Sequence, residues 1–211
     1  MERKSLFKSL YSDGLLIEVV DMTSINPDRY DSGMACHENR QREKAATQIA
    51  VDCMFNRHVE IKHAPDGHPY IEGVEGSLSI SHARNILVAV YSPNHVIGVD
   101  IEYQREALKR VATKFLNETE QEYANDIENL LRAWTVKEAV YKAMLHKGLS
   151  LFAIKLPPLD EKEPHAVVET DEGQVSIKLY FGKIDKAMVT LAVRDDAEYR
   201  GTDLSLQPDW I

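Results

Sequence analysis

Asp100 and Glu102 stand two positions apart in the apolar segment 96–102. In a β-strand, alternate side chains point to the same face, so both carboxylates are expected side by side. Ile97, Val99 and Ile101 are expected on the opposite, buried face. Held about 5 Å apart at an effective dielectric constant near 20, they repel by roughly 3 kcal/mol. A divalent cation offsets this repulsion. Oxygen ligands without His or Cys alongside favour Mg²⁺. The alternative interpretation is an acidic strand end exposed to solvent.

The segment 134–142 combines three charged residues with two large rings. Wound as an α-helix at about 100° per residue, it places its apolar residues on a core side and the charged residues opposite. Aromatic rings share that charged side, which favours a face that closes over an anion or a bound metal. The residues concerned are Trp134, Lys137, Glu138, Tyr141 and Lys142. The alternative is an exposed Glu-Lys pair that contributes a few tenths of a kcal/mol.

Other hydrophobic patterns predict the elements that position these residues. Branched and alternating runs predict strands at 15–20, 77–82, 86–91, 96–102, 165–170, 175–181 and 187–193. The strands at 77–102 are expected to form a three-stranded meander, and the last three to pair as antiparallel neighbours. Helical spacing predicts helices at 35–57 and 107–116, and helical structure from about 120 to a C-cap at Gly148.

The predicted elements are typical of an α+β protein. The order strand, helix, strands is followed by strand, helices, strands, so the same arrangement occurs twice. A boundary near His95–Gly98 divides the chain into halves of roughly 100 residues, close to the lower size for an independent core.

Composition excludes several classes of function. The 211 residues carry a formal net charge of -9, which disfavours nucleic acid as a partner. No apolar run is long enough to span a membrane, and the first residues lack the apolar core of a secretory signal, so we expect a cytoplasmic protein. Cys36 and Cys53 lack partners at metal-ligand spacing and are expected to be reduced.

The two acidic segments together resemble the paired signature of the 4'-phosphopantetheinyl transferases, specifically the larger two-subdomain type similar to the surfactin synthetase activator. The first is Gly98-Val-Asp-Ile-Glu102, and the second is Trp134-Thr-Val-Lys-Glu-Ala-Val-Tyr-Lys142. Three further stretches extend the resemblance over most of the chain. They are Ser79-Ile-Ser81-His82, Lys114-Phe-Leu-Asn-Glu-Thr-Glu120, and residues 37–47, which are similar to a basic helix start that contacts coenzyme A.

The resemblance implies a fold and an activity. The fold is two similar α/β subdomains, residues 1–97 and 98–211, with the active site at their interface. The activity is transfer of the 4'-phosphopantetheine arm of coenzyme A to a serine of an acyl or peptidyl carrier protein, with Mg²⁺ as cofactor and 3',5'-bisphosphoadenosine as by-product. A monomer suffices for a complete site of this kind.

The resemblance also implies roles for individual residues. Asp100, Glu102 and Glu138 would bind Mg²⁺, and Glu138 would take the serine proton. Lys142 would stabilise charge on the reacting phosphate. The remaining predicted contacts to coenzyme A are Arg40, His68, Ser81, His82 and Lys137.

The chain departs from the family pattern at three places. His68 stands where the family has a lysine, Gln48 where it often has an arginine, and residues 144–148 replace a glycine-rich turn. An imidazole is a weaker partner for phosphate than an ammonium. Two other functions therefore stay open: a relative that binds coenzyme A or a carrier protein without catalysis, and a Mg²⁺-dependent phosphohydrolase that uses the same carboxylates.

Overall fold

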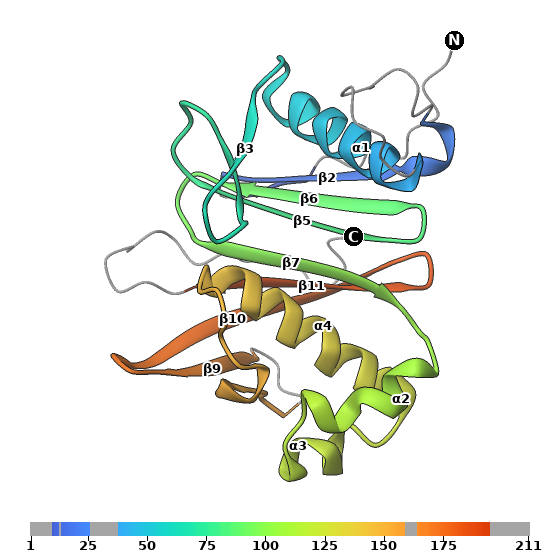
Figure 1. Ribbon diagram of the computed structural model, residues 1–211, viewed down its shortest axis with the longest axis vertical. Helices are drawn as coiled ribbons and strands as arrows, with labels where there is room; N and C mark the ends of the chain where they lie inside the picture. Colours follow the sequence, from blue (N-terminus) through green and yellow to red (C-terminus); the bar gives the residue numbers. More distant parts are fainter. Residues whose placement is uncertain (1–9, 13, 26–37, 159–163, 195–211) are drawn as a thin grey trace.

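The structure is a computed structural model that describes residues 10–12, 14–25, 38–158 and 164–194. It is a mixed α/β protein in which helices pack on two main β-sheets (Figure 1). Cys36 and the first residues of the helix predicted at 35–57, residues 35–37, lie outside the described residues.

The first sheet is antiparallel and has the strand order β1-β2-β6-β5. Its strands are β1 (Leu10–Ser12), β2 (Leu15–Asp21), β5 (Ser77–Ala83) and β6 (Ile86–Ser92). A 3-10 turn, η1 (Met22–Ser24), follows β2, and helix α1 (Glu38–Phe55) covers one face of the sheet. A separate hairpin of β3 (Ile61–His63) and β4 (Pro69–Ile71) precedes β5. The strands and the helix predicted here are confirmed, whereas the hairpin was not predicted.

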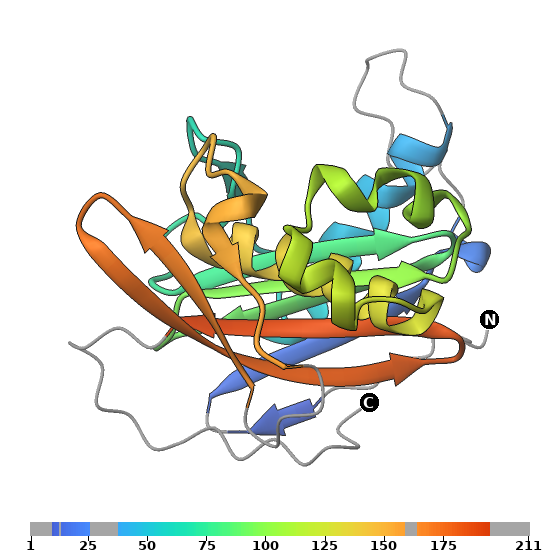
Figure 2. The same ribbon diagram turned by 90° about the horizontal axis from the view of Figure 1, so that it is seen from below.

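The second sheet is also antiparallel, in the order β7-β11-β10-β9-β8. Its strands are β7 (Ile97–Tyr103), β8 (Ile154–Lys155), β9 (His165–Thr170), β10 (Gly173–Ile184) and β11 (Ala187–Arg194). The predicted antiparallel pairing of the last three strands is confirmed. Helix α4 (Ile127–Met144) packs on this sheet, and Figure 2 shows it on the same side as the short helices.

The helical region between β7 and β8 is more divided than predicted. It contains α2 (Ala107–Val111), η3 (Ala112–Lys114), α3 (Glu118–Tyr123) and then α4, with η4 (Leu151–Ala153) following. Asn117 and Glu120 form a capping box at α3, and Asp126 caps α4. The C-cap predicted at Gly148 is wrong: α4 ends at Met144 because Leu145 takes a left-handed conformation with φ of 50°.

The expected meander of β5, β6 and β7 is wrong, because β7 pairs with β11 instead of β6. Strand β5 lies beside the free edge of β7, and serine hydroxyls of β5 accept the N–H groups of β7. The pairs are Ser77–Ile97 at 3.2 Å, Ser79–Val99 at 2.9 Å and Ser81–Ile101 at 3.3 Å. These short polar side chains satisfy backbone donors that burial would otherwise leave unpaired.

Within the described part of the chain, three hydrophobic clusters form the core. One lies between α4 and the second sheet, and one lies between α1 and the first sheet. The third contains residues from β2, β6, β7 and β11, among them Ile17, Val90, Val99 and Leu191. Because this cluster draws on strands of both sheets, it holds the two halves of the chain against each other.

Gly98 determines how closely α4 approaches β7. A Cβ atom at this position would lie 2.0 Å from the carbonyl oxygen of Ala139 and 2.6 Å from the backbone nitrogen of Ala143. Both atoms belong to the backbone of α4, so they cannot move aside as a flexible side chain would. The helix therefore rests directly on the strand because residue 98 has no side chain.

We predict that Gly98→Ala lowers the free energy of unfolding by about 1–3 kcal/mol or more, because the added methyl group forces α4 away from β7. Urea denaturation followed by circular dichroism measures the change. A variant as stable as the wild type within about 0.5 kcal/mol would contradict the direct contact between helix and strand.

Candidate functional site

Asp100 lies on the face of β7 that α4 covers, and its side chain is almost fully buried. Its Oδ1 atom accepts hydrogen bonds from Ser81 Oγ at 2.8 Å and from Lys142 Nζ at 2.9 Å. Lys142 Nζ also donates to the carbonyl of Val99 at 2.8 Å. The predicted burial of the other face of β7 is confirmed by Ile97, Val99 and Ile101 in the core. One carboxylate thus joins residues from β5, β7 and α4.

Glu138 lies one helical turn before Lys142 and is half-buried. Burial raises the pKa of its carboxyl group, the negative charge of Asp100 raises it further, and Lys142 acts in the opposite direction. Glu138 therefore lies within electrostatic range of both Asp100 and Lys142. A carboxylate with a raised pKa is suited to accept a proton near neutral pH.

Glu102 takes its hydrogen bond and its ion pair from Tyr103 and Arg105, and not from Lys142 or Ser81. Its Oε1 atom accepts the N–H of Tyr103 at 2.9 Å, and its Oε2 atom lies 2.8 Å from a guanidinium nitrogen of Arg105. Among the described residues, no group of three or more His, Cys, Asp or Glu side chains is arranged to hold a metal ion. Binding of one Mg²⁺ by Asp100, Glu102 and Glu138 together thus stays a prediction.

The carboxylate oxygens of Asp100 and Glu138 nevertheless suit Mg²⁺ as ligands. Asp100 and Glu138 offer oxygen atoms, and after burial the negative charge of Asp100 is the second cause of the raised pKa of Glu138. Mg²⁺ is commonly bound through one or two carboxylates, with water and substrate phosphates completing its coordination. Two carboxylates without a third are consistent with that pattern.

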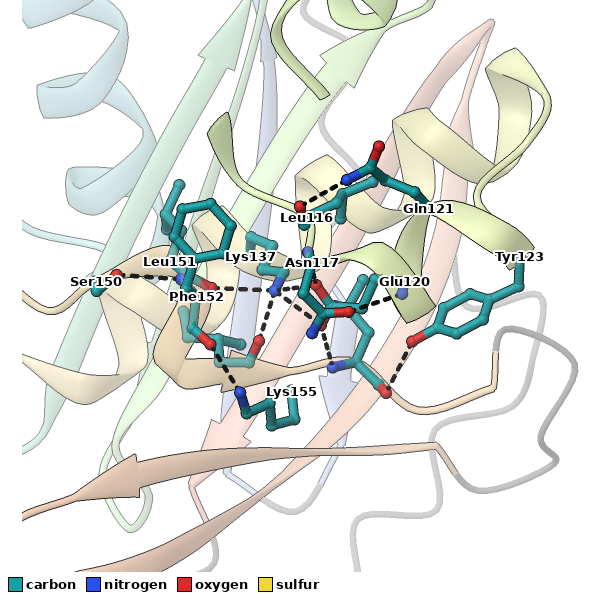
Figure 3. A network of polar contacts seen from close by, with 12 residues as sticks. Leu116, Asn117, Glu120, Gln121, Tyr123, Lys137, Ser150, Leu151, Phe152 and Lys155 are labelled. Carbon is teal, nitrogen blue, oxygen red and sulfur yellow. Dashed lines mark hydrogen bonds and ion pairs between the residues drawn. The ribbon is translucent and has the colours of Figure 1, made fainter. Parts of the chain in front are cut away.

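Lys137 is not on the same surface as Glu138, contrary to the expected helix face. Its side chain is completely buried, and Nζ donates to both carboxylate oxygens of Glu120 at 2.9 Å. It also donates to the carbonyls of Leu151 at 3.0 Å and Ile154 at 2.5 Å (Figure 3). Burial lowers the pKa of Lys137, and Glu120 opposes that effect.

Glu120 organises the same network from the other side. Its carboxylate accepts the backbone N–H of Asn117 and of Leu156, each at 3.0 Å. The Lys137–Glu120 pair therefore ties α4 and α3 to η4, to β8 and to the residue that follows β8 (Figure 3). Trp134, expected on the charged face, instead packs edge-on against Phe115 with ring centroids 4.9 Å apart.

A pocket of about 300 Å³ lies next to Lys142. It is lined from the N-terminal half of the chain by residues 66–69, residues 78–80 and Ile97, and from the C-terminal half by residues of α4 and the turn after it. His68, predicted to bind coenzyme A, and Tyr141 both line it. The structure thus brings His68 and Lys142 to one cavity.

The remaining predicted residues do not line this pocket. Ser81 is buried and bonded to Asp100, so its hydroxyl acts within the protein. His82 faces the opposite side of β5, where Nε2 lies 3.6 Å from Oε2 of Glu43 on α1. Arg40 is exposed near the start of α1. Gln48 donates to Asp52 and to the carbonyl of Val59 and so stabilises the end of α1.

Sequence reasoning missed three residues of this region. Asp66, His146 and Lys147 line the pocket with His68 and Lys142. The spacing Asp-Gly-His at 66–68 was a usable signal, because an Asp side chain often bonds the backbone two residues later, as Asp66 does with the N–H of His68 at 3.2 Å. No pattern in the sequence pointed to His146 or Lys147.

We predict that Lys137→Ala lowers the free energy of unfolding by about 3–5 kcal/mol, because it leaves the buried Glu120 carboxylate without its cation. Lys109→Ala is the matched control, since it removes an exposed lysine that pairs with Glu106, and should change stability by less than about 1 kcal/mol. Chemical denaturation of both variants makes the comparison. If both variants change the free energy of unfolding by less than about 1 kcal/mol, the buried Lys137–Glu120 pair is not needed for stability.

Glu138→Gln should affect stability in a way that depends on pH. The folded-state pKa of Glu138 lies above its ordinary value of 4.5, so ionising it costs more in the folded than in the unfolded protein. The wild type therefore loses stability relative to the variant as the pH rises from about 4.5 through the raised pKa. Unfolding measured at about pH 4 and about pH 7 tests this, and a difference that stays constant with pH would refute it.

No helix in the described residues is long and apolar enough to cross a membrane. A search of curated proteins found no match to this chain. Residues 96–194, the region that contains Asp100, Glu138 and Lys142, match the family model of the 4'-phosphopantetheinyl transferase superfamily.

Proposed function

We propose that the protein transfers the 4'-phosphopantetheine arm of coenzyme A to a serine hydroxyl of an acyl or peptidyl carrier protein. The observation that carries this proposal is the convergence of Ser81, Lys142 and Glu138 on Asp100, with a cavity beside Lys142. The family match over residues 96–194 supports the same reaction class.

We propose further that the chain consists of two similar subdomains, residues 1–97 and 98–211, with the active site at their interface. In support, the pocket has walls from both parts of the chain. Asp100 is likewise bonded to Ser81 of the first part and Lys142 of the second. Such a site is complete within one chain, so a cytoplasmic monomer would suffice for activity.

Coenzyme A would enter the pocket with its pyrophosphate toward Lys142. His68 lines the same cavity and would contact a phosphate group, and Arg40 and His82 would extend the contact along α1. We assign Lys137 no contact with coenzyme A, because its ammonium group is enclosed by Glu120 and two backbone carbonyls. Ser81 would act by orienting Asp100, since its hydroxyl is buried against that carboxylate.

The reaction would proceed by attack of the carrier serine oxygen on the phosphorus next to the pantetheine arm. A new P–O bond forms, the bond within the pyrophosphate breaks, and 3',5'-bisphosphoadenosine leaves with the electron pair. Glu138 would accept the serine proton, for which its raised pKa makes it suitable. The Lys142 ammonium would offset negative charge on the phosphate oxygens.

Mg²⁺ bound by Asp100 and Glu138, with Glu102 as a third carboxylate once released from Arg105, would neutralise the pyrophosphate charge. The protein's own part is to hold Asp100 and Glu138 in place. Ser81 and Lys142 fix Oδ1 of Asp100 by hydrogen bonds. Gly98 allows the helix that carries Glu138 and Lys142 to reach β7.

We predict that Glu138→Gln reduces carrier-protein modification by about 10²–10⁴-fold, because the serine proton loses its acceptor. The assay is mass spectrometry of an apo carrier protein incubated with coenzyme A, Mg²⁺ and enzyme. Glu128→Gln on the same helix, exposed and paired with Lys183, is the matched control and should keep wild-type activity.

Each other outcome of this assay has a definite meaning. Full conversion by Glu138→Gln would remove Glu138 from the mechanism. Release of phosphopantetheine or phosphate by the wild type without any carrier protein would favour a phosphohydrolase. Tight coenzyme A binding without conversion across a panel of carrier proteins would favour a binding protein.

A further inference from the structure

Each of the two acidic residues of β7 is paired with a positively charged side chain from outside the strand. Oδ1 of Asp100 lies 2.9 Å from Nζ of Lys142 on α4. Oε2 of Glu102 lies 2.8 Å from a guanidinium nitrogen of Arg105, in the segment that joins β7 to α2. An internal cation therefore offsets the charge of each carboxylate. A metal ion that binds both carboxylates has to compete with these two side chains.

Lys142 is the more firmly held of the two cations. Nζ donates to the carbonyl of Val99 at 2.8 Å as well as to Oδ1 of Asp100, and the side chain is 28% exposed. Its departure would break two hydrogen bonds, one of them between charged groups. Lys142 can also stay in place, because Asp100 has a second carboxylate oxygen, Oδ2, with which to bind a cation. The pair at Asp100 is thus compatible with a bound metal ion.

Arg105 is held more weakly. Its side chain is 51% exposed, and its ion pair with Glu102 joins residues three positions apart. Such exposed pairs contribute little to stability, because water solvates both groups once they separate. The backbone stays fixed when the pair opens, since the carbonyl of Arg105 accepts the N–H of Leu108 at 3.1 Å and Leu108 is fully buried. The guanidinium can therefore leave Glu102 without disturbing α2.

Glu102 has to give up two contacts before it can bind a metal ion together with Asp100. Oε2 is paired with Arg105, and Oε1 accepts the backbone N–H of Tyr103 at 2.9 Å. Alternation along β7 puts the side chains of Asp100 and Glu102 on one face of the strand. Rotation of the Glu102 side chain is then sufficient to turn its carboxylate from Arg105 toward Asp100. The backbone N–H of Tyr103 reports that movement.

We propose that Arg105 is a positioning residue that holds Glu102 away from Asp100 and thereby sets the affinity of the site for Mg²⁺. Only molecules in which this ion pair is open can bind the ion through all three carboxylates, so the apparent affinity is reduced by the fraction that is open. The inference rests on the proposed function in one respect, the binding of Mg²⁺ at Asp100 and Glu138. It adds a residue that controls this binding without touching the ion.

The probe is Mg²⁺ alone, added to the full chain without coenzyme A or carrier protein. Its dissociation constant is measured by ¹⁵N–¹H NMR titration at fixed ionic strength, for the wild type and for Arg105→Ala. We expect the variant to bind Mg²⁺ about two- to fivefold more tightly, which is the range that the opening of one exposed ion pair corresponds to. In the wild type, the signal of the Tyr103 N–H should shift in step with binding, because the Glu102 carboxylate leaves it.

Two further comparisons separate direct contact from general charge. Arg110→Ala removes an equal charge from an exposed position on α2 and should bind Mg²⁺ as the wild type does. In a Glu102→Gln background, Arg105→Ala should leave the dissociation constant unchanged, because the effect of Arg105 passes through the Glu102 carboxylate.

Four results would overturn the proposed role of Arg105. The first two are tightening by Arg110→Ala that equals the tightening by Arg105→Ala, and tightening that persists in the Glu102→Gln background. The other two are equal Mg²⁺ affinity of the wild type and Arg105→Ala, and no binding of Mg²⁺ by either protein.

The result can be separated from the test of the transferase proposal. Modified carrier proteins together with a Mg²⁺ affinity that does not depend on Arg105 would remove the role of Arg105 and leave the transferase proposal standing. Control of Mg²⁺ binding by Arg105 in a protein that modifies no carrier would support the role of Arg105 and contradict the transferase proposal.

Discussion

The contact between the backbone of α4 and the backbone of β7 at Gly98 is the constraint on which the site depends. With no side chain between them, the carbonyl of Ala139 and the nitrogen of Ala143 lie over the strand. This close approach lets Lys142 reach both Asp100 and the carbonyl of Val99. A larger residue at position 98 would move the helix, and the cation and the carboxylates would separate together.

Helix α4 uses two lysines, five positions apart, for opposite purposes. Lys137 is completely buried and bound on all sides, which makes it part of the scaffold. Lys142 is about one quarter exposed and lines a cavity, so its ammonium can contact a ligand as well as Asp100. Both lysines contact a buried carboxylate, but Lys137 Nζ is enclosed by both oxygens of Glu120 and by two backbone carbonyls. The Glu120 carboxylate also accepts two backbone N–H groups.

Local patterns predicted most of the elements. Alternation and branched residues located β2, β5, β6, β7 and the last three strands, because burial on one face produces those patterns. The pairing of β7 could not be predicted in this way, since strand partners depend on contacts between distant segments. Alternation located the strand that carries the serines of β5, yet their use as acceptors for the edge of β7 required the structure.

The same distinction applies to the site. The alternation of β7 placed Asp100 and Glu102 on the face opposite Ile97, Val99 and Ile101, and helical spacing placed Glu138 one turn before Lys142. Periodicity could not show that Glu102 is engaged by Arg105, or that Lys137 is paired with Glu120, because both depend on partners outside the motif. Asp66, His146 and Lys147 were missed because a loop and a turn bring them to the pocket.

The central claim is that Asp100, Glu138 and Lys142 form one reaction centre with the adjoining cavity. A crystal structure of the protein with coenzyme A and Mg²⁺ tests it most directly. The account predicts a cation bound by oxygens of Asp100 and Glu138, with the pyrophosphate of coenzyme A beside Lys142. Coenzyme A bound elsewhere, or Glu138 directed into solvent in the complex, would contradict it.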